Sequence, residues 1–243
     1  MEITFKKTVQ VKNLEQWFNC APPEGGMKQW KPGRSAMEMA RFALSERFPA
    51  FISEIAKGIG CKEKHFDCEP EALTPFNKDM GKSGPRHHDL LLVGKNLVIG
   101  VEAKVSEPYD SKISEKRKKA ESENNNNMIC RLDSCLSYLY GTNLPKNVED
   151  LYYQLFSATI GTILAAKNNH KTKALVLFIT FTGDVEKERY YNKHIQDNED
   201  AFKAFCNSLG LGDEGGKIPN VPGDPQIECW IKSVKINIGN YSF

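Results

Sequence analysis

The chain of 243 residues lacks the features that mark several large protein classes. No apolar run approaches the roughly 20 residues that cross a bilayer, and residues 1–5 do not resemble a signal peptide. The seven cysteines are dispersed, with no CxxC pair and no regular framework, which is typical of a reducing compartment. We therefore expect a cytoplasmic protein without a membrane partner.

Common catalytic fingerprints are also absent. The sequence has no P-loop, no GxSxG elbow, no HExxH pair and no dinucleotide-binding glycine pattern. Its net charge of +2 is nearly balanced, so it lacks the strong basic excess of dedicated nucleic-acid binders. Clustering can still create a basic face, and residues 112–119 include five basic side chains.

The hydrophobic pattern predicts one α/β domain covering residues 1–243. We expect strands at about 2–10, 89–94, 97–105 and 174–181, and a late edge strand or hairpin at 226–238. We expect helices at about 12–19, 35–47, 49–56, 129–140, 148–168 and 196–209. Residues 61–86 look irregular, with at most one short strand. This order of elements is typical of a mixed sheet flanked by helices.

The most informative stretch contains two apolar runs that end in charged residues. Asp89 opens the first run, the triplet Glu102-Ala103-Lys104 closes the second, and residues 94–96 form the turn between them. Because side chains alternate along a strand, Glu102 and Lys104 point to the same side. If residues 95 and 96 are a two-residue hairpin loop, Asp89 lies opposite Glu102.

This arrangement predicts a metal site. Two facing carboxylates repel each other, and a divalent cation removes the repulsion. Asp89 and Glu102 supply hard oxygen ligands without an accompanying Cys or His set, which suits Mg²⁺ or Mn²⁺. Lys104 would lie beside the cation, where it can hold a phosphate oxygen or orient a water molecule. The alternative is a structural ion pair at the edge of the sheet.

Asp89 followed by Glu102-Ala103-Lys104 resembles the D…(D/E)xK signature of the PD-(D/E)xK nuclease superfamily. The proline that usually precedes the first acid is displaced, since His88 stands there. The resemblance implies the restriction-endonuclease-like fold, a three-layer core with a mixed central β-sheet flanked by helices. It also implies Mg²⁺-dependent hydrolysis of phosphodiester bonds in DNA, or in RNA. The carboxylates would bind the cation with the Ala103 carbonyl, and Lys104 would help to activate water.

Three longer segments, residues 30–38, 102–109 and 151–155, resemble an uncharacterised bacterial branch of that superfamily. The resemblance places the core at about residues 30–182 and a C-terminal extension at 183–243. It also implies that Glu38, from the first core helix, joins the metal site and that Gln154 lies beside the catalytic lysine. A capping-box contact to an N-cap at Ser35 and a buried structural amide are the respective alternatives.

We expect contacts to nucleic acid from side chains around this site. Cations at a helix start attract phosphate, a histidine can act as a base or phosphate ligand, and a tyrosine can stack on a base. Solvated loops, an exposed helical face and ordinary packing are the alternatives for these positions. Ser106 and Glu107 should line the same cleft. The expected contact residues are Lys31, Arg34, His87, His88, Tyr109 and Lys112.

Three functions stay open at this stage. The first is a Mg²⁺-dependent nuclease, and the second is a catalytically inactive nucleic-acid- or protein-binding module of the same fold. The third is a one-metal hydrolase or transferase that acts on a small phosphate ester. Cutting both strands of a duplex needs two sites, which a homodimer would supply.

Overall fold

The computed structural model describes residues 2–82, 84–105, 107–183 and 188–240. Its centre is a mixed eight-stranded sheet with the strand order β2-β1-β3-β4-β5-β6-β8-β7. This is the predicted α/β class. The strands are β1 (Glu2–Phe5), β2 (Val9–Gln10), β3 (Asp67–Thr74), β4 (Arg86–Val93), β5 (Leu97–Lys104), β6 (Lys173–Thr182), β7 (Gly215–Lys217) and β8 (Glu228–Asn237).

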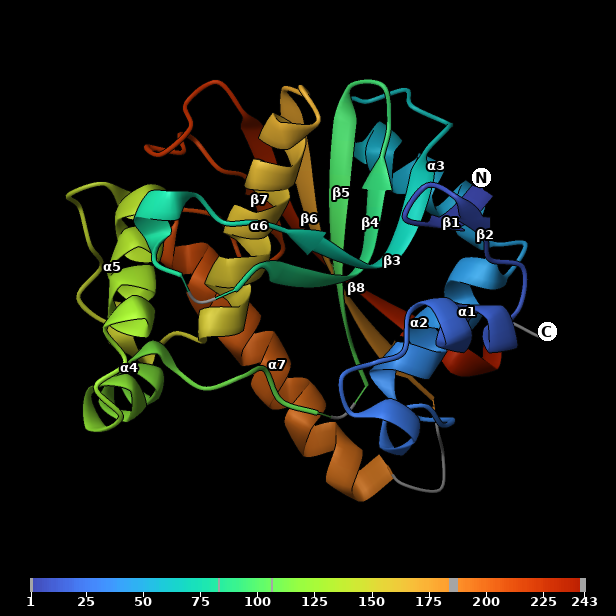
Figure 1. Cartoon of the computed structure of the whole chain (residues 1–243), viewed down its shortest axis with the longest axis horizontal. Coiled ribbons are helices and arrows are strands. Elements are labelled where there is room, and N and C mark those ends of the chain that lie inside the picture. Colours follow the sequence, from blue (N-terminus) through green and yellow to red (C-terminus); the bar gives the residue numbers. More distant parts are fainter. Residues whose placement is uncertain (1, 83, 106, 184–187, 241–243) are drawn as a thin grey trace.

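Helices cover both faces of the sheet and make three layers (Figure 1). Residues of α5, α6 and α7 pack on one face, against Val98 and Val176. Residues of α1, α2 and α3 pack on the other face, against Ile99 and Leu177. The helices are α1 (Leu14–Cys20), α2 (Ser35–Leu44), α3 (Phe48–Gly58), α4 (Ile113–Ser122), α5 (Asn126–Tyr140), α6 (Tyr153–Asn168) and α7 (Glu188–Ser208).

The central hairpin has the predicted loop. The backbone N–H of Gly94 donates to the carbonyl of Leu97 over 2.8 Å, so residues 95 and 96 form a two-residue turn. The antiparallel ladder then runs from Val93 opposite Val98 to Leu90 opposite Val101. Both strands are rich in Leu, Ile and Val, which favour a sheet that is buried on both faces.

One edge of the sheet collects the ends of several strands. Strands β5, β6 and β8 are parallel, so their carboxyl ends lie at the same edge. Strand β4 is antiparallel to both β5 and β3, which brings the start of β4 and the end of β3 to that edge as well. Polar side chains at these ends can therefore meet although they are far apart in sequence.

Two strands differ from the expectation. Residues 61–86 contain β3, a full central strand that pairs with both β1 and β4. The sequence does not indicate this strand, because Pro70 and several acidic residues interrupt the apolar pattern. Strand β8 pairs with β6 along its whole length, while β7 covers only Trp230–Lys232 on its outer side. The C-terminal part of the chain thus contributes a long strand, β8, to the same sheet.

The helices that the sequence predicts are all present in the structure. Helix α6 is buried on nearly all sides, as expected for a core helix, and Phe202 and Phe205 of α7 face the interior. Helix α2 begins at Ser35 after an N-cap at Arg34, so the predicted N-cap at Ser35 is wrong by one residue. Within the described ranges, every helix is too short or too polar to cross a membrane.

Candidate active site

A cavity of about 330 Å³ lies at the edge where these strands end. Its walls come from the loop at residues 23–29, the start of α2, Glu71 of β3, the start of β4, the end of β5, the segment after β5 and the start of α6. Half of the predicted site residues meet here despite their separation in sequence. They are Arg34, His87, Asp89, Glu102, Lys104 and Gln154.

Glu102 is the centre of the site. It is buried, and its Oε1 accepts a hydrogen bond from Nζ of Lys104 over 3.0 Å. This contact confirms that the two side chains share one side of β5. Oε1 also accepts from Nε2 of Gln154, and Oε2 pairs with Nη2 of Arg86. Two cations and an amide therefore compensate the burial of this carboxylate.

Asp89 is held across the hairpin. Its Oδ2 accepts a hydrogen bond from the backbone N–H of Ala103 over 2.6 Å. The β4–β5 ladder ends at Leu90 opposite Val101, one residue before Asp89 and Glu102. Burial raises the pKa of Asp89, while Lys104 and the Ala103 N–H oppose that rise.

Strand β4 is irregular at Asp89. Leu90 packs with the α2 and α3 side, and Leu91 packs with the α6 side, as alternation requires. His88 should then share the face of Leu90, but it lies against Gly161 of α6. The alternation is therefore interrupted at Asp89, where its carboxylate takes a backbone N–H of β5.

Lys104 is buried between acidic and aromatic groups. Its Nζ lies 5.8 Å from the ring centroid of Tyr109, in cation–π range. Burial lowers the pKa of Lys104, and the carboxylates of Asp89 and Glu107 oppose this effect. The lysine is thus placed among carboxylates, next to the space in which a ligand would bind.

Gln154 connects the site to the segment after β5. Its Nε2 donates to Glu102, and its Oε1 accepts from the backbone N–H of Asp110 over 3.1 Å. The polar residue in an otherwise apolar helix therefore has partners for both ends of its amide.

Sequence reasoning missed several residues of the cavity, among them the charged residues Glu71 and Arg86. Glu71 belongs to β3, the strand that the sequence pattern concealed. Burial, followed by the charge of Asp89, raises the pKa of Glu71 from 4.5 to about 8. Arg86 begins β4, and burial lowers its pKa although Asp89 and Glu71 are close. Their positions relative to Asp89 follow only from strand pairing, which no local pattern reveals.

Several predicted residues lie elsewhere. Glu38 does not line the cavity: its Oε1 accepts from the Gly33 N–H over 2.9 Å and from Arg41 over 3.2 Å. This contact to the start of α2 replaces the capping-box contact and the metal-site role that were expected. Lys31 is exposed outside the cavity, and Lys112 is the N-cap of α4.

His88 and Tyr109 are interior residues, not ligand contacts. Nε2 of His88 lies 3.0 Å from Oγ1 of Thr74, and burial holds the pKa of His88 well below its usual range. The ring of Tyr109 is buried and packs edge-on against Phe178, with centroids 6.0 Å apart. The expected contacts of His88 and Tyr109 with nucleic acid are therefore wrong, because both side chains are buried. Ser106 lies outside the described residues.

The donor chemistry of the cavity suits a hard cation. Five acidic and three basic side chains line it, and carboxylate oxygens are the preferred ligands of Mg²⁺ and Mn²⁺. In the part of the chain that the structure describes, however, no three His, Cys, Asp or Glu side chains form a ready metal cluster. Glu102 faces Arg86 and Lys104 instead. A cation that binds Glu102 would therefore have to bind beside Arg86 and Lys104 or displace them.

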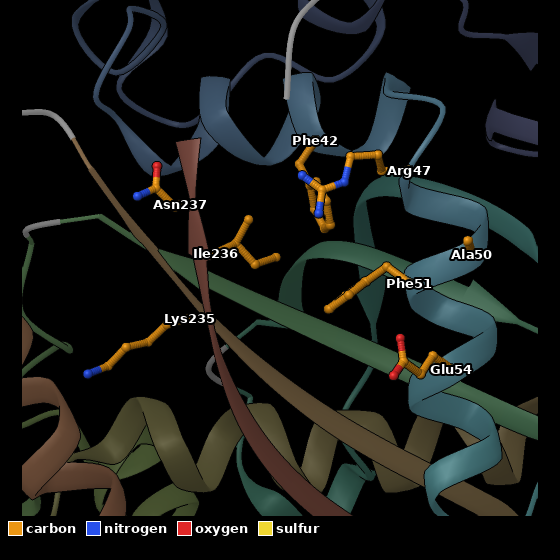
Figure 2. A pocket seen from close by; sticks show the side chains of 8 residues that line it. All are labelled: Phe42, Arg47, Ala50, Phe51, Glu54, Lys235, Ile236 and Asn237. Carbon is orange, nitrogen blue, oxygen red and sulfur yellow. The ribbon is translucent and has the colours of Figure 1, made fainter. Parts of the chain in front are cut away.

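A second cavity of about 340 Å³ lies between α2, α3 and the end of β8 (Figure 2). Phe51 of α3 and Ile236 of β8 point toward each other across it. Among the described residues, Glu54 is the only acidic side chain in its lining, where Arg47 and Lys235 are also found. This cavity has no group of carboxylates from neighbouring strands, so we do not assign it to the same chemistry.

Comparison with known proteins gives one match. The model of a family described as "Domain of unknown function (DUF6946)" matches residues 10–237. No curated protein matches the chain. No solved structure matches it either.

Proposed function

The chain belongs to the DUF6946 family, a domain of unknown function, and from its site we propose a nuclease dependent on Mg²⁺ or Mn²⁺. It would hydrolyse phosphodiester bonds of DNA, or of RNA. The proposal includes membership of the PD-(D/E)xK superfamily, whose signature the sequence resembles.

One observation carries the proposal. Asp89, Glu102 and Lys104 come from two adjacent strands and line one cavity, at the edge where the strands end. Lys104 contacts Glu102 directly, as the spacing of the D…ExK motif requires. Gln154 supports the same carboxylate from α6. A structural ion pair explains the Lys104 contact but not the convergence of further acids in an open cavity.

Each side chain of the site has a separate role in this proposal. Asp89 and Glu102 would hold the cation, which lowers the pKa of a water molecule and offsets charge on the phosphate. Lys104 would donate to a non-bridging phosphate oxygen and stabilise the negative charge that develops there. Gln154 orients Glu102. Arg34 and His87, on the wall of the cavity, would contact the nucleic-acid backbone.

A second function is favoured by the contacts of Glu102. Both of its oxygens are engaged by Arg86, Lys104 and Gln154. A carboxylate satisfied in this way can be purely structural, and the domain would then be an inactive module that binds nucleic acid or protein. This alternative predicts binding that does not depend on divalent cations.

Cleavage of labelled DNA and RNA, single- and double-stranded, with Mg²⁺, Mn²⁺ or EDTA tests the proposal. We expect cutting only with a divalent cation and a loss of about 100-fold or more in Lys104→Ala. The matched control is Lys57→Ala, an exposed lysine in the last turn of α3, which should cut like the wild type.

Two results would overturn the nuclease assignment. One is equal activity in the Lys104→Ala and wild-type proteins. The other is no cutting of any substrate together with cation-independent binding of nucleic acid, which would establish the inactive module instead.

A further inference from the structure

Arg86 is a largely buried cation of the cavity, and the proposed function gives it no role. It is the first residue of β4, and its side chain is 12% exposed. Its Nη2 contacts Oε2 of Glu102, which is the one acceptor for this guanidinium among the described residues. Nε is buried without a partner there. Because a guanidinium has five N–H donors, the described residues use little of its hydrogen-bonding capacity.

Helix α6 leaves space for the Arg86 side chain. Gly161 lies in the middle of this helix, where glycine is less favourable than alanine. A β-carbon at position 161 would lie 2.6 Å from Cγ and 2.9 Å from Cβ of Arg86. These two carbons are close to the backbone of β4 and cannot move aside as the far end of the side chain could. The glycine therefore gives the arginine the space it needs beside α6.

Glu102 holds two cations at once. While Oε2 contacts Arg86, Oε1 accepts a hydrogen bond from Nζ of Lys104 over 3.0 Å. Two positive groups on one carboxylate lie close together, and both side chains line the cavity. The ammonium of Lys104 has three donors, and Glu102 is its one hydrogen-bond acceptor among the described residues. The pair therefore has further N–H donors for a second anion.

Directed hydrogen bonds, and not general attraction, would select that anion. Five acidic side chains also line the cavity, so its overall charge does not favour anions. A phosphate group offers several oxygens, which can accept from two separate cations at the same time. Charge-assisted hydrogen bonds of this kind are short and strong, and arginine binds phosphate with two of its donors.

We propose that Arg86 and Lys104, held by the two oxygens of Glu102, form a clamp for one phosphodiester group of the nucleic acid. One non-bridging oxygen accepts from Lys104, as in the proposed function, and the other accepts from Arg86. The inference rests on the proposed function for the identity of the substrate, but it does not require a bound divalent cation. The clamp would therefore bind phosphate in the presence of EDTA.

Calorimetric titration with inorganic phosphate in EDTA tests the clamp without requiring cleavage. Arg86→Gln should weaken phosphate binding by about tenfold or more, because it removes a charged donor. A dinucleotide with one phosphodiester bond, titrated in the same way, should show the same loss. Arg117→Gln is the matched control, since it removes a partly exposed arginine with the same change in charge. We expect this control to bind both probes like the wild type.

Two calorimetric results would overturn the clamp. One is the absence of phosphate binding by the wild type. The other is equal affinity of the wild type and folded Arg86→Gln for either probe, since the clamp requires the guanidinium for both.

A second measurement uses the unmodified protein, in case Arg86→Gln fails to fold. The side-chain Nε resonance of Arg86 should shift in nuclear magnetic resonance spectra as phosphate is added, with saturation at the calorimetric affinity. An unmoved resonance at saturating phosphate would contradict the clamp.

Failure of this inference and failure of the nuclease function are distinguishable. Phosphate binding in EDTA that is lost in Arg86→Gln, without cleavage of any nucleic acid, supports the clamp and contradicts the nuclease. Metal-dependent cleavage by a protein whose phosphate affinity does not depend on Arg86 contradicts the clamp alone.

Discussion

The hydroxyl of Thr162 on α6 packs directly against the backbone of Gly100 on β5. A β-carbon on Gly100 would overlap Oγ1 of Thr162 and lie 3.0 Å from Nδ1 of His88. The Thr162 hydroxyl is also fixed, since it donates to the carbonyl of Ala158 over 2.8 Å. This close contact sets the distance between α6 and β5, and therefore between Gln154 and Glu102.

We expect Gly100→Ala to lower the free energy of unfolding by about 2 kcal/mol, because the added methyl group forces the helix and strand apart. Chemical denaturation measures the change. Gly212→Ala is the control, since a β-carbon there meets nothing within 4 Å. Equal stability of the two variants would show that the packing at Gly100 is looser than described.

Arg131 fixes the segment that leads into β4. It is buried, and its guanidinium donates to the carbonyls of Met80 over 2.6 Å and of Gly81 and Gly84 over 3.0 Å each. We expect Arg131→Met to lower the free energy of unfolding by about 3 kcal/mol or more, since it leaves these carbonyls without their donor. Urea denaturation at constant pH provides the measurement.

The control for Arg131→Met is Arg117→Met, which removes partly exposed pairs with Glu149 and Asp133. Exposed ion pairs contribute little, so the expected loss is about 1 kcal/mol or less. A similar loss in both variants would contradict the role assigned to Arg131.

Glu71 should make stability depend on pH. Its pKa is about 8 in the folded protein, above the ordinary 4.5, so the folded state keeps a proton that the unfolded chain releases. This contribution to stability is complete below about pH 4.5 and is lost as the pH rises through about 8. Relative to Glu71→Gln, the wild type should lose up to about 1.4 kcal/mol per pH unit between these values.

Urea denaturation at several pH values, with EDTA present, measures this difference. Parallel stability curves for the two proteins across that range would contradict the raised pKa of Glu71.

Gln154 is a positioning residue for Glu102. Gln154→Met keeps the volume of the side chain but removes the donor to Oε1 of Glu102. We expect kcat for nucleic-acid cleavage to fall about 10- to 100-fold, with little change in KM, because both ends of the Gln154 amide are bonded to the protein, at Glu102 and at the Asp110 N–H. The exposed Gln196→Met serves as the control. A rise in KM alone would instead indicate a substrate contact.

The hairpin of the site could be predicted because its information is local. The two apolar strands and the two-residue turn bring Asp89 near the end of β5, and the alternation of side chains puts Glu102 and Lys104 on one side of that strand. The site role of Gln154 followed from the resemblance to the superfamily, because a polar residue in an apolar helix indicates only that its amide needs a partner.

Glu71 and Arg86 could not be found in the same way. Both depend on the pairing of β3 with β4, and the acidic residues and proline of β3 mask its strand pattern. His88 was misplaced because the interruption at Asp89 turns it toward α6, against the regular alternation. The late edge strand or hairpin expected at 226–238 corresponds to β8, of which β7 pairs with only three residues.

The dependence of cleavage on Mg²⁺ concentration, compared between the wild type and Asp89→Asn, tests the central claim most directly. We predict no cleavage in EDTA, a rate that saturates with Mg²⁺ in the wild type, and a half-saturating concentration at least about tenfold higher in Asp89→Asn. Cleavage that persists in EDTA, or identical Mg²⁺ curves for the two proteins, would contradict a cation held by the carboxylates of this cavity.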